Sequence, residues 1–155
     1  MGKKMKLLSL ILLLLFTTNI WAQKLYVVSV GICDYKDPHV NDLRFTEADV
    51  VSFNKVIKTH TNEVYTLLGA NATHHNVYSY ISQVFAKATS NDAVMLFFSG
   101  HGYPGGFCCY DMDKTRGGLT YTEISSLFKQ CKAKCKMVFA DACFSGGLRK
   151  EKKGN

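Results

Sequence analysis

The segment "DAVMLFFSGHG", residues 92–102, decides the fold of this chain. Its unbroken apolar run stops at the sequence Ser-Gly-His-Gly, which leaves His101 between two glycines. Continuous apolar runs bounded by glycine are typical of strands buried on both faces of a parallel sheet. Open parallel sheets bind ligands beyond the carboxyl ends of their strands. The sequence therefore predicts a buried strand here and a functional site at His101.

Similar segments alternate along the rest of the chain. Strands are expected at residues 25–32, 62–69, 92–100 and 136–143, and helices at residues 42–60, 73–88 and 120–131. Thr73 is a suitable N-cap for the second helix, and Thr120 with Glu123 has the spacing of a capping box. This alternation predicts an α/β fold, a three-layer αβα sandwich with a mostly parallel sheet and helices on both faces. Residues 102–118 are expected to form a long, glycine-rich and mobile connection.

The first 22 residues have the composition of a secretory signal peptide. Three lysines precede the apolar block "LLSLILLLLF", and the small residue Ala22 follows at a suitable cleavage site. The apolar block is too short to span a bilayer comfortably, which argues against a membrane anchor. We therefore expect a signal peptide over residues 1–22, a secreted or periplasmic protein, one domain over residues 23–148 and a basic tail over residues 149–155.

Removal of this segment changes the charge of the chain. The full sequence has 19 basic and 12 acidic side chains, a net charge of +7. Without the three lysines of the signal, 16 basic and 12 acidic side chains leave +4, and four of these basic groups lie in the tail. The folded part is near neutral, so the basic balance gives no reason to expect nucleic acid as a partner. No membrane partner is expected after signal cleavage.

The cysteines, histidines and acidic residues do not follow a metal-binding pattern. The six cysteines form neither a CxxC pair nor a matched second pair. Cys131 and Cys135 are spaced one helical turn apart, and we expect both in one helix, where buried packing explains at least one of them. His74 and His75 lack a third ligand. The segment that begins at Asp111 has Arg116 at position six and Thr122 at position twelve, where an EF-hand loop requires Gly and Glu. No metal and no cofactor are therefore expected.

A second short segment, "DACFSGG" at residues 141–147, carries the other reactive group. It follows the last expected strand, just as His101 follows the strand before it. If the two strands are neighbours, His101 and Cys143 emerge side by side at one edge of the sheet. An imidazole that takes or shares the proton of a thiol turns the sulfur into a nucleophile. The amide groups of Gly102 and Cys143 would then be placed to hold an oxyanion.

"FFSGHG" followed by "DACFSG", in this order and at the ends of consecutive buried strands, resembles the caspase and metacaspase-like cysteine peptidases. Cys143 follows His101 by 42 residues, and "VGICDY" after the first strand also fits the opening of this family, so the resemblance covers about residues 25 to 148. It implies the caspase–haemoglobinase fold and a cysteine endopeptidase. His101 would be the general base and acid, and Cys143 the nucleophile.

The resemblance also implies which residues bind the substrate. In metacaspase-like members, acids matching Asp49 and Asp141 and a serine matching Ser99 line the pocket for the residue before the cleaved bond. Carboxylates there favour Arg or Lys, because a desolvated cation needs a compensating charge. True caspases instead bind aspartate with arginines, and Arg44, the nearest candidate, is one position away from the required place. We expect cleavage after Arg or Lys. Asp141 could instead brace the strand end, and Asp49 could be an ordinary exposed helix residue.

The chain departs from the family at its carboxyl end. It ends twelve residues after Cys143, whereas relatives continue through about two more strands, so the expected domain corresponds to the large-subunit part and lacks the last strands. Two hypotheses follow. The chain is a peptidase that cleaves peptides or proteins, alone or with a separate C-terminal fragment or a second copy that completes the sheet. Alternatively, it is a catalytically inactive caspase-like module that acts through partner binding. A redox role for Cys108 and Cys109 is a third, more distant alternative.

Overall fold

A computed structural model describes residues 23–113 and 117–143 of the chain. The expected signal peptide and basic tail lie outside these residues. Within them, no helix combines the length and the apolar character that crossing a membrane requires.

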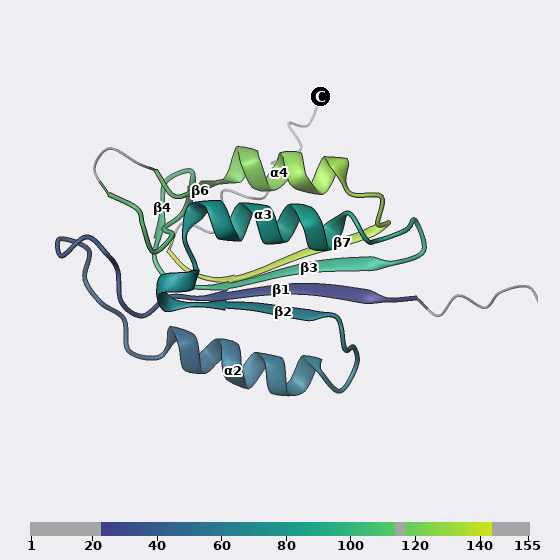
Figure 1. The fold of residues 1–155 in the computed structure, drawn as a ribbon, viewed down its shortest axis with the longest axis horizontal. Coiled ribbons are helices and arrows are strands. Elements are labelled where there is room, and N and C mark those ends of the chain that lie inside the picture. The colour runs from purple at the N-terminus through teal and green to yellow at the C-terminus, as the bar shows by residue number, and fades with distance from the viewer. Residues whose placement is uncertain (1–22, 114–116, 144–155) are drawn as a thin grey trace, which may run out of the picture.

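Four parallel strands form the centre of the molecule, in the spatial order β2-β1-β3-β7 (Figure 1). These strands are β1 (Leu25–Gly31), β2 (Val64–Leu68), β3 (Ala93–Ser99) and β7 (Cys135–Asp141). Helix α2 (Thr46–Ile57) covers one face, and helices α3 (His74–Phe85) and α4 (Tyr121–Gln130) cover the other, as Figure 1 shows. A short 3₁₀ helix (Gly69–Asn71) follows β2. The expected three-layer α/β sandwich is confirmed.

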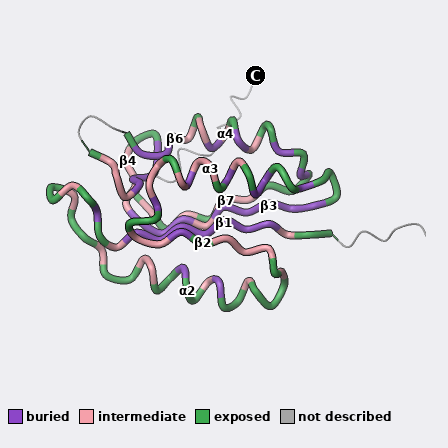
Figure 2. The backbone as a smooth tube through the Cα atoms, in the orientation of Figure 1, coloured by how far each residue is buried: buried purple, intermediate pink, exposed green. Residues whose placement is uncertain are grey.

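The position of β1 and β3 in the middle of the sheet explains their continuous apolar sequences. Strands β1 and β3 are buried along almost their whole length because both of their faces are covered (Figure 2). Their register pairs Gly31 with Ser99, and Ser99 in turn pairs with Asp141 of β7. The carboxyl ends of β1, β3 and β7 are therefore level, and the segments that follow them leave the sheet at the same rim.

The helix ends follow their capping residues. The Thr73 hydroxyl accepts the amide of Asn76, and Thr120 with Glu123 forms the complete capping box that the sequence predicts. Helix α2 begins at Thr46 rather than at residue 42, because the preceding backbone is used elsewhere. The amide of Leu43, for example, donates to the carbonyl of Cys33.

Residues 102–118, predicted to be a long, glycine-rich and mobile connection, contain strands within their described part. Strand β4 (Gly102–Tyr103), β5 (Gly106–Phe107) and, just beyond, β6 (Leu119–Thr120) form a small antiparallel sheet. Its anchor is Phe107, which is fully buried and stacks on Phe98 of β3 with ring centroids 4.4 Å apart. The sequence did not predict these strands, because each of them is only two residues long and the segment is rich in glycine.

The prediction that Cys131 and Cys135 share a helix is wrong. Helix α4 ends at Gln130, and Cys131 is its C-cap in an extended conformation, whereas Cys135 is the first residue of β7. The ammonium of Lys136 caps the end of the helix by donating to the carbonyl oxygens of Phe128 and Cys131, at 2.5 Å and 2.8 Å. Cys131 is buried and Cys135 is exposed.

Strand β7 forms one edge of the four-stranded sheet and is covered unevenly. On the side of α3 and α4, Val138 and Ala140 pack against the core. Phe139 is paired with Phe97, which stacks on Phe53 of α2, so its side chain lies on the α2 face. Phe139 is nevertheless 53% exposed because α2 lies over β1, β2 and β3.

Candidate active site

His101 lies just beyond the end of β3, in the turn that leads to β4. The amide of Gly100 donates to the carbonyl of Asp141 at 3.2 Å, so the contact between β3 and β7 continues past the last residue of β3. The carbonyl of His101 accepts the amide of Cys108 at 2.9 Å. This turn is therefore fixed on one side by β7 and on the other by the small antiparallel sheet.

The connection between β1 and α2 holds the imidazole of His101. The ring nitrogen Nε2 lies 2.7 Å from the carbonyl oxygen of Asn41, and the ring packs against Tyr35 with centroids 5.1 Å apart. A carbonyl oxygen can only accept, so Nε2 carries the proton and donates it to this bond. In the neutral imidazole this leaves Nδ1 as the nitrogen with a free lone pair.

Cys143 lies two residues beyond the end of β7, and it is exposed. Its backbone touches Gly102, the residue after His101. A Cβ atom built on Gly102 would collide with the carbonyl oxygen of Cys143 and would lie 3.4 Å from the Cβ of Ala142. The structure therefore brings the two segments that carry His101 and Cys143 into direct backbone contact, and only glycine permits this approach.

The three residues expected to bind the substrate lie at the same corner of the sheet. The hydroxyl of Ser99, which is fully buried, donates to Oδ2 of Asp49 on α2 at 3.5 Å. Asp141 is the direct neighbour of Ser99 across the β3–β7 ladder and is exposed. Paired residues of parallel strands project to the same face, so all three side chains belong to the α2 side of the rim. Arg44 is also exposed and lies two residues before α2.

Two residues of the site do not follow from the sequence patterns alone. Tyr35 is buried, at 8% exposure, and its hydroxyl accepts the backbone amide of His101 at 2.8 Å. Asn41 acts through its backbone carbonyl, which any residue carries. The only sequence signal for Tyr35 is its place in "VGICDY" after the first strand.

The cysteines differ in their surroundings. Burial raises the pKa of the Cys108 thiol to about 11 and that of the Cys109 thiol to about 12, which lowers the thiolate fraction of both at neutral pH. Cys33 is half-buried, and its sulfur accepts the Thr46 hydroxyl at 3.2 Å. Within residues 23–113 and 117–143, the exposed thiols are those of Cys135 and Cys143.

No cluster of three or more metal-ligating side chains occurs in the part of the chain that the structure describes. His74, for which the sequence offers no complete set of metal ligands, has its Nε2 atom 3.0 Å from Oε1 of Glu123. This contact joins the first turns of α3 and α4, so His74 has a structural partner.

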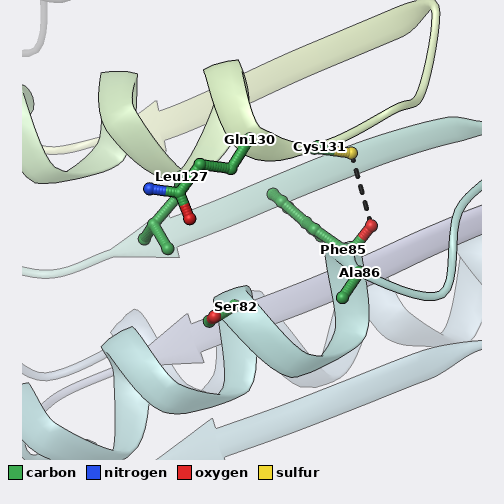
Figure 3. A pocket seen from close by; sticks show the side chains of 6 residues that line it. All are labelled: Ser82, Phe85, Ala86, Leu127, Gln130 and Cys131. Atoms are coloured by element: carbon green, nitrogen blue, oxygen red, sulfur yellow. Dashed lines mark hydrogen bonds between the residues drawn. The ribbon is translucent and has the colours of Figure 1, made fainter.

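A small cavity between the ends of α3 and α4 is distinct from this site (Figure 3). It has a volume of about 170 Å³ and is lined by Ser82, Phe85, Ala86, Leu127, Gln130 and Cys131. The Cys131 thiol donates to the carbonyl of Phe85 at 3.4 Å, the dashed line in Figure 3. The helices end where the strands begin, so the cavity lies at the opposite end of the sheet from His101.

The fold and the site together define a class of α/β proteins with a histidine and a cysteine beyond the carboxyl ends of two adjacent parallel strands. The model of the caspase domain matches residues 25–155, and the chain belongs to this family of cysteine peptidases. One of 105 matching chains of known structure is protein GSU0716 from Geobacter sulfurreducens, with a TM-score of 0.65 and 24% sequence identity. The match covers 77% of this chain and 50% of that chain, so this chain spans about half the length of its structural neighbour. No curated protein matches the chain.

Proposed function

We propose that the protein is a cysteine endopeptidase in which Cys143 is the nucleophile and His101 the general base and acid. The observation that carries this proposal is the backbone contact between Gly102 and Cys143 at the end of the β3–β7 ladder. Among the described thiols, Cys143 alone combines exposure with a place beside His101. The membership in the caspase-domain family supports the same chemistry.

The hydrogen bond of the His101 ring determines which of its nitrogens takes part in each proposed step. The Asn41 carbonyl keeps the proton on Nε2, so Nδ1 accepts the proton of the Cys143 thiol. The thiolate then adds to the carbonyl carbon of the substrate, and the backbone amides of Gly102 and Cys143 stabilise the oxyanion. The imidazolium gives its proton to the leaving amine, which leaves an acyl-enzyme. Finally, His101 takes a proton from water, the hydroxide attacks the thioester, and the acid product and free thiol are released.

We propose a substrate with Arg or Lys before the cleaved bond. Asp49 and Asp141 bring two carboxylates to the corner occupied by Ser99, and Asp141 is exposed at the rim. A cationic side chain between these groups would gain charge-assisted hydrogen bonds. Other acidic side chains at this end of the sheet, Asp34, Asp42 and Glu47, favour a basic peptide as well.

The second candidate function is that of a non-catalytic module that binds a partner. The exposed Phe139 on β7 favours it. Among the described residues no strand pairs with the outer side of β7, and an open edge with an apolar side chain is suited to pairing with another strand. The partner would be a separate C-terminal fragment or a second copy of the chain. A partner that completes the sheet is equally compatible with the peptidase.

The two functions are separated by assaying the chain with peptides that carry Arg, Lys or Asp before the cleaved bond. Cleavage after Arg or Lys that disappears in the Cys143→Ala variant supports the peptidase. Cleavage after Asp would support the peptidase activity and contradict the proposed preference for Arg or Lys. Arg44 would then be the first residue to test for binding of the substrate Asp. No cleavage by a protein whose circular dichroism shows a folded α/β domain favours the binding module.

A further inference from the structure

We infer that Tyr35 is the positioning residue of His101: its hydroxyl fixes the backbone of the histidine while its ring supports the imidazole. This inference rests on the proposed function, because Tyr35 would act in the same reaction by holding His101 in place. It is carried by the contacts of one buried side chain with both parts of His101.

The contacts of Tyr35 leave His101 little freedom. The hydroxyl accepts the His101 amide at 2.8 Å, and the two rings lie 5.1 Å apart and are inclined by 36°. A Cβ atom on Gly100 would lie 3.0 Å from the Tyr35 oxygen. The phenol therefore sits directly under the turn between β3 and β4, where any side chain at Gly100 would crowd it.

The segment that contains Tyr35 is itself closed by hydrogen bonds. The amide of Tyr35 donates to Oδ1 of Asp42 at 3.3 Å, and the amide of Leu43 donates to the Cys33 carbonyl at 2.8 Å. The Asn41 carbonyl that binds Nε2 of His101 belongs to the same segment. One folded loop therefore holds the histidine at two points, the backbone through Tyr35 and the ring through Asn41.

The chemistry of the phenol suits this role. Burial raises the pKa of Tyr35, so the hydroxyl keeps its proton and offers a neutral oxygen to the His101 amide. Without the hydroxyl the amide would remain beside an apolar ring with no acceptor, and the turn would shift to find one. A shift of about 1 Å in a catalytic group costs about 100-fold in rate.

The test compares Tyr35→Phe with wild type in two measurements on the full chain. With a peptide that carries Arg before the cleaved bond, we expect kcat to fall about 10- to 100-fold while KM changes by less than about twofold, because the substrate pocket is not touched. With iodoacetamide at neutral pH, we expect the wild-type Cys143 to react about tenfold faster than the exposed Cys135, and this excess to be largely lost in Tyr35→Phe.

Two matched variants interpret the result. Tyr65→Phe removes a phenol oxygen that contacts Glu63 and Lys87, far from the site, and should leave both measurements unchanged. Asp42→Ala removes the acceptor of the Tyr35 amide from an exposed position; it should give a smaller loss of kcat, and it replaces Tyr35→Phe if that variant fails to fold.

The inference and the proposed function fail in different ways. If His101→Ala abolishes the excess reactivity of Cys143 but Tyr35→Phe and Asp42→Ala behave as wild type, Tyr35 is not a positioning residue and the peptidase stands. If His101→Ala leaves the reactivity of Cys143 unchanged, the proposed pair of His101 and Cys143 is wrong, and the role of Tyr35 falls with it.

Discussion

The two ends of the parallel sheet have different tasks. At the carboxyl ends, the chain leaves the strands through His101 and Cys143, and the same end of the sheet carries exposed or half-buried carboxylates: Asp34, Asp42, Glu47, Asp49 and Asp141. At the amino ends, the exposed charges are mostly lysines: Lys24, Lys55, Lys58, Lys87, Lys129, Lys132, Lys134 and Lys136. The carboxylate of Asp92 also lies at the amino ends of the strands, where it accepts hydrogen bonds from Thr89 and from the amide of Lys24.

Asp92 and Asp141 are the same residue type at opposite ends of the sheet, and their surroundings give them different roles. Asp92 is buried and joins the starts of β1 and β3. Asp141 is exposed at the other end of the sheet. Its backbone carbonyl accepts the amide of Gly100, and this bond does not involve its carboxylate. Substitution of Asp141 should therefore change activity, and substitution of Asp92 should change stability.

Among substitutions outside His101 and Cys143, the largest effect is expected for Gly102→Ala. The added methyl group would collide with the carbonyl oxygen of Cys143 and force the two segments apart, so kcat should fall by about 100-fold or more. Peptide cleavage measures this loss. Gly117→Ala is the matched control, because among the described residues a Cβ atom there comes near the Tyr103 oxygen alone, at 3.8 Å. Wild-type kcat in Gly102→Ala would separate this contact from catalysis.

A smaller effect is expected for Asp141→Asn. Loss of a charged hydrogen bond to the substrate costs about 1.5–3 kcal/mol, so KM for peptides with Arg or Lys should rise about 10- to 100-fold. The thermal midpoint should change little because the carboxylate is exposed. Steady-state kinetics gives both constants, and unchanged kinetics would remove Asp141 from the pocket.

Asp92→Asn reverses this pattern. Burial opposes the charge of Asp92, but hydrogen bonds from Thr89 and the Lys24 amide outweigh it and lower the pKa of the carboxyl. The variant should lose about 1–3 kcal/mol of unfolding free energy, measured by urea denaturation. Its kcat/KM per folded molecule should equal that of wild type. A change in kcat/KM without a change in stability would mean that the two ends of the sheet are not independent.

The smallest effect is expected at Glu123, a carboxylate at the site end of the molecule with a structural task. Burial opposes its charge, but hydrogen bonds with Thr120 and the contact with His74 lower its pKa below the usual 4.5. Because the folded-state pKa is lowered, this contribution to stability is complete above about pH 4.5 and is lost as the pH falls through the folded-state value. Glu123→Gln should cost about 1 kcal/mol at pH 7 and nothing in acid. An equal difference at both pH values would contradict this explanation.

Most of the fold could be predicted from the sequence, because its main helices and strands are long and each shows either the apolar run of a buried strand or the periodicity and capping residues of a helix. Apolar runs mark β1 and β3, and Thr73, Thr120 and Glu123 mark two helix starts. The errors fall where local patterns are short or ambiguous. The two-residue strands of the small sheet resemble loops, and the spacing of Cys131 and Cys135 fits a helix although an extended residue ends α4.

The candidate site could be predicted only in part. Side chains with unusual chemistry in unusual places, such as His101 and Cys143, are visible in the sequence. Their supports are not. Asn41 contributes a backbone carbonyl, and the contact of Tyr35 with His101 joins residues 66 positions apart. Such contacts depend on how a loop closes over the sheet rim, which no local pattern specifies.

The most direct test of the central claim, that His101 and Cys143 act together at one rim of the sheet, is labelling with a peptidyl chloromethyl ketone that ends in arginine. Mass spectrometry of the labelled chain identifies the thiol that has displaced chloride. We expect one adduct, on Cys143, and at least tenfold slower labelling in the His101→Ala variant. An adduct on Cys33 or Cys135 instead, or equal labelling rates in the two proteins, would contradict the account.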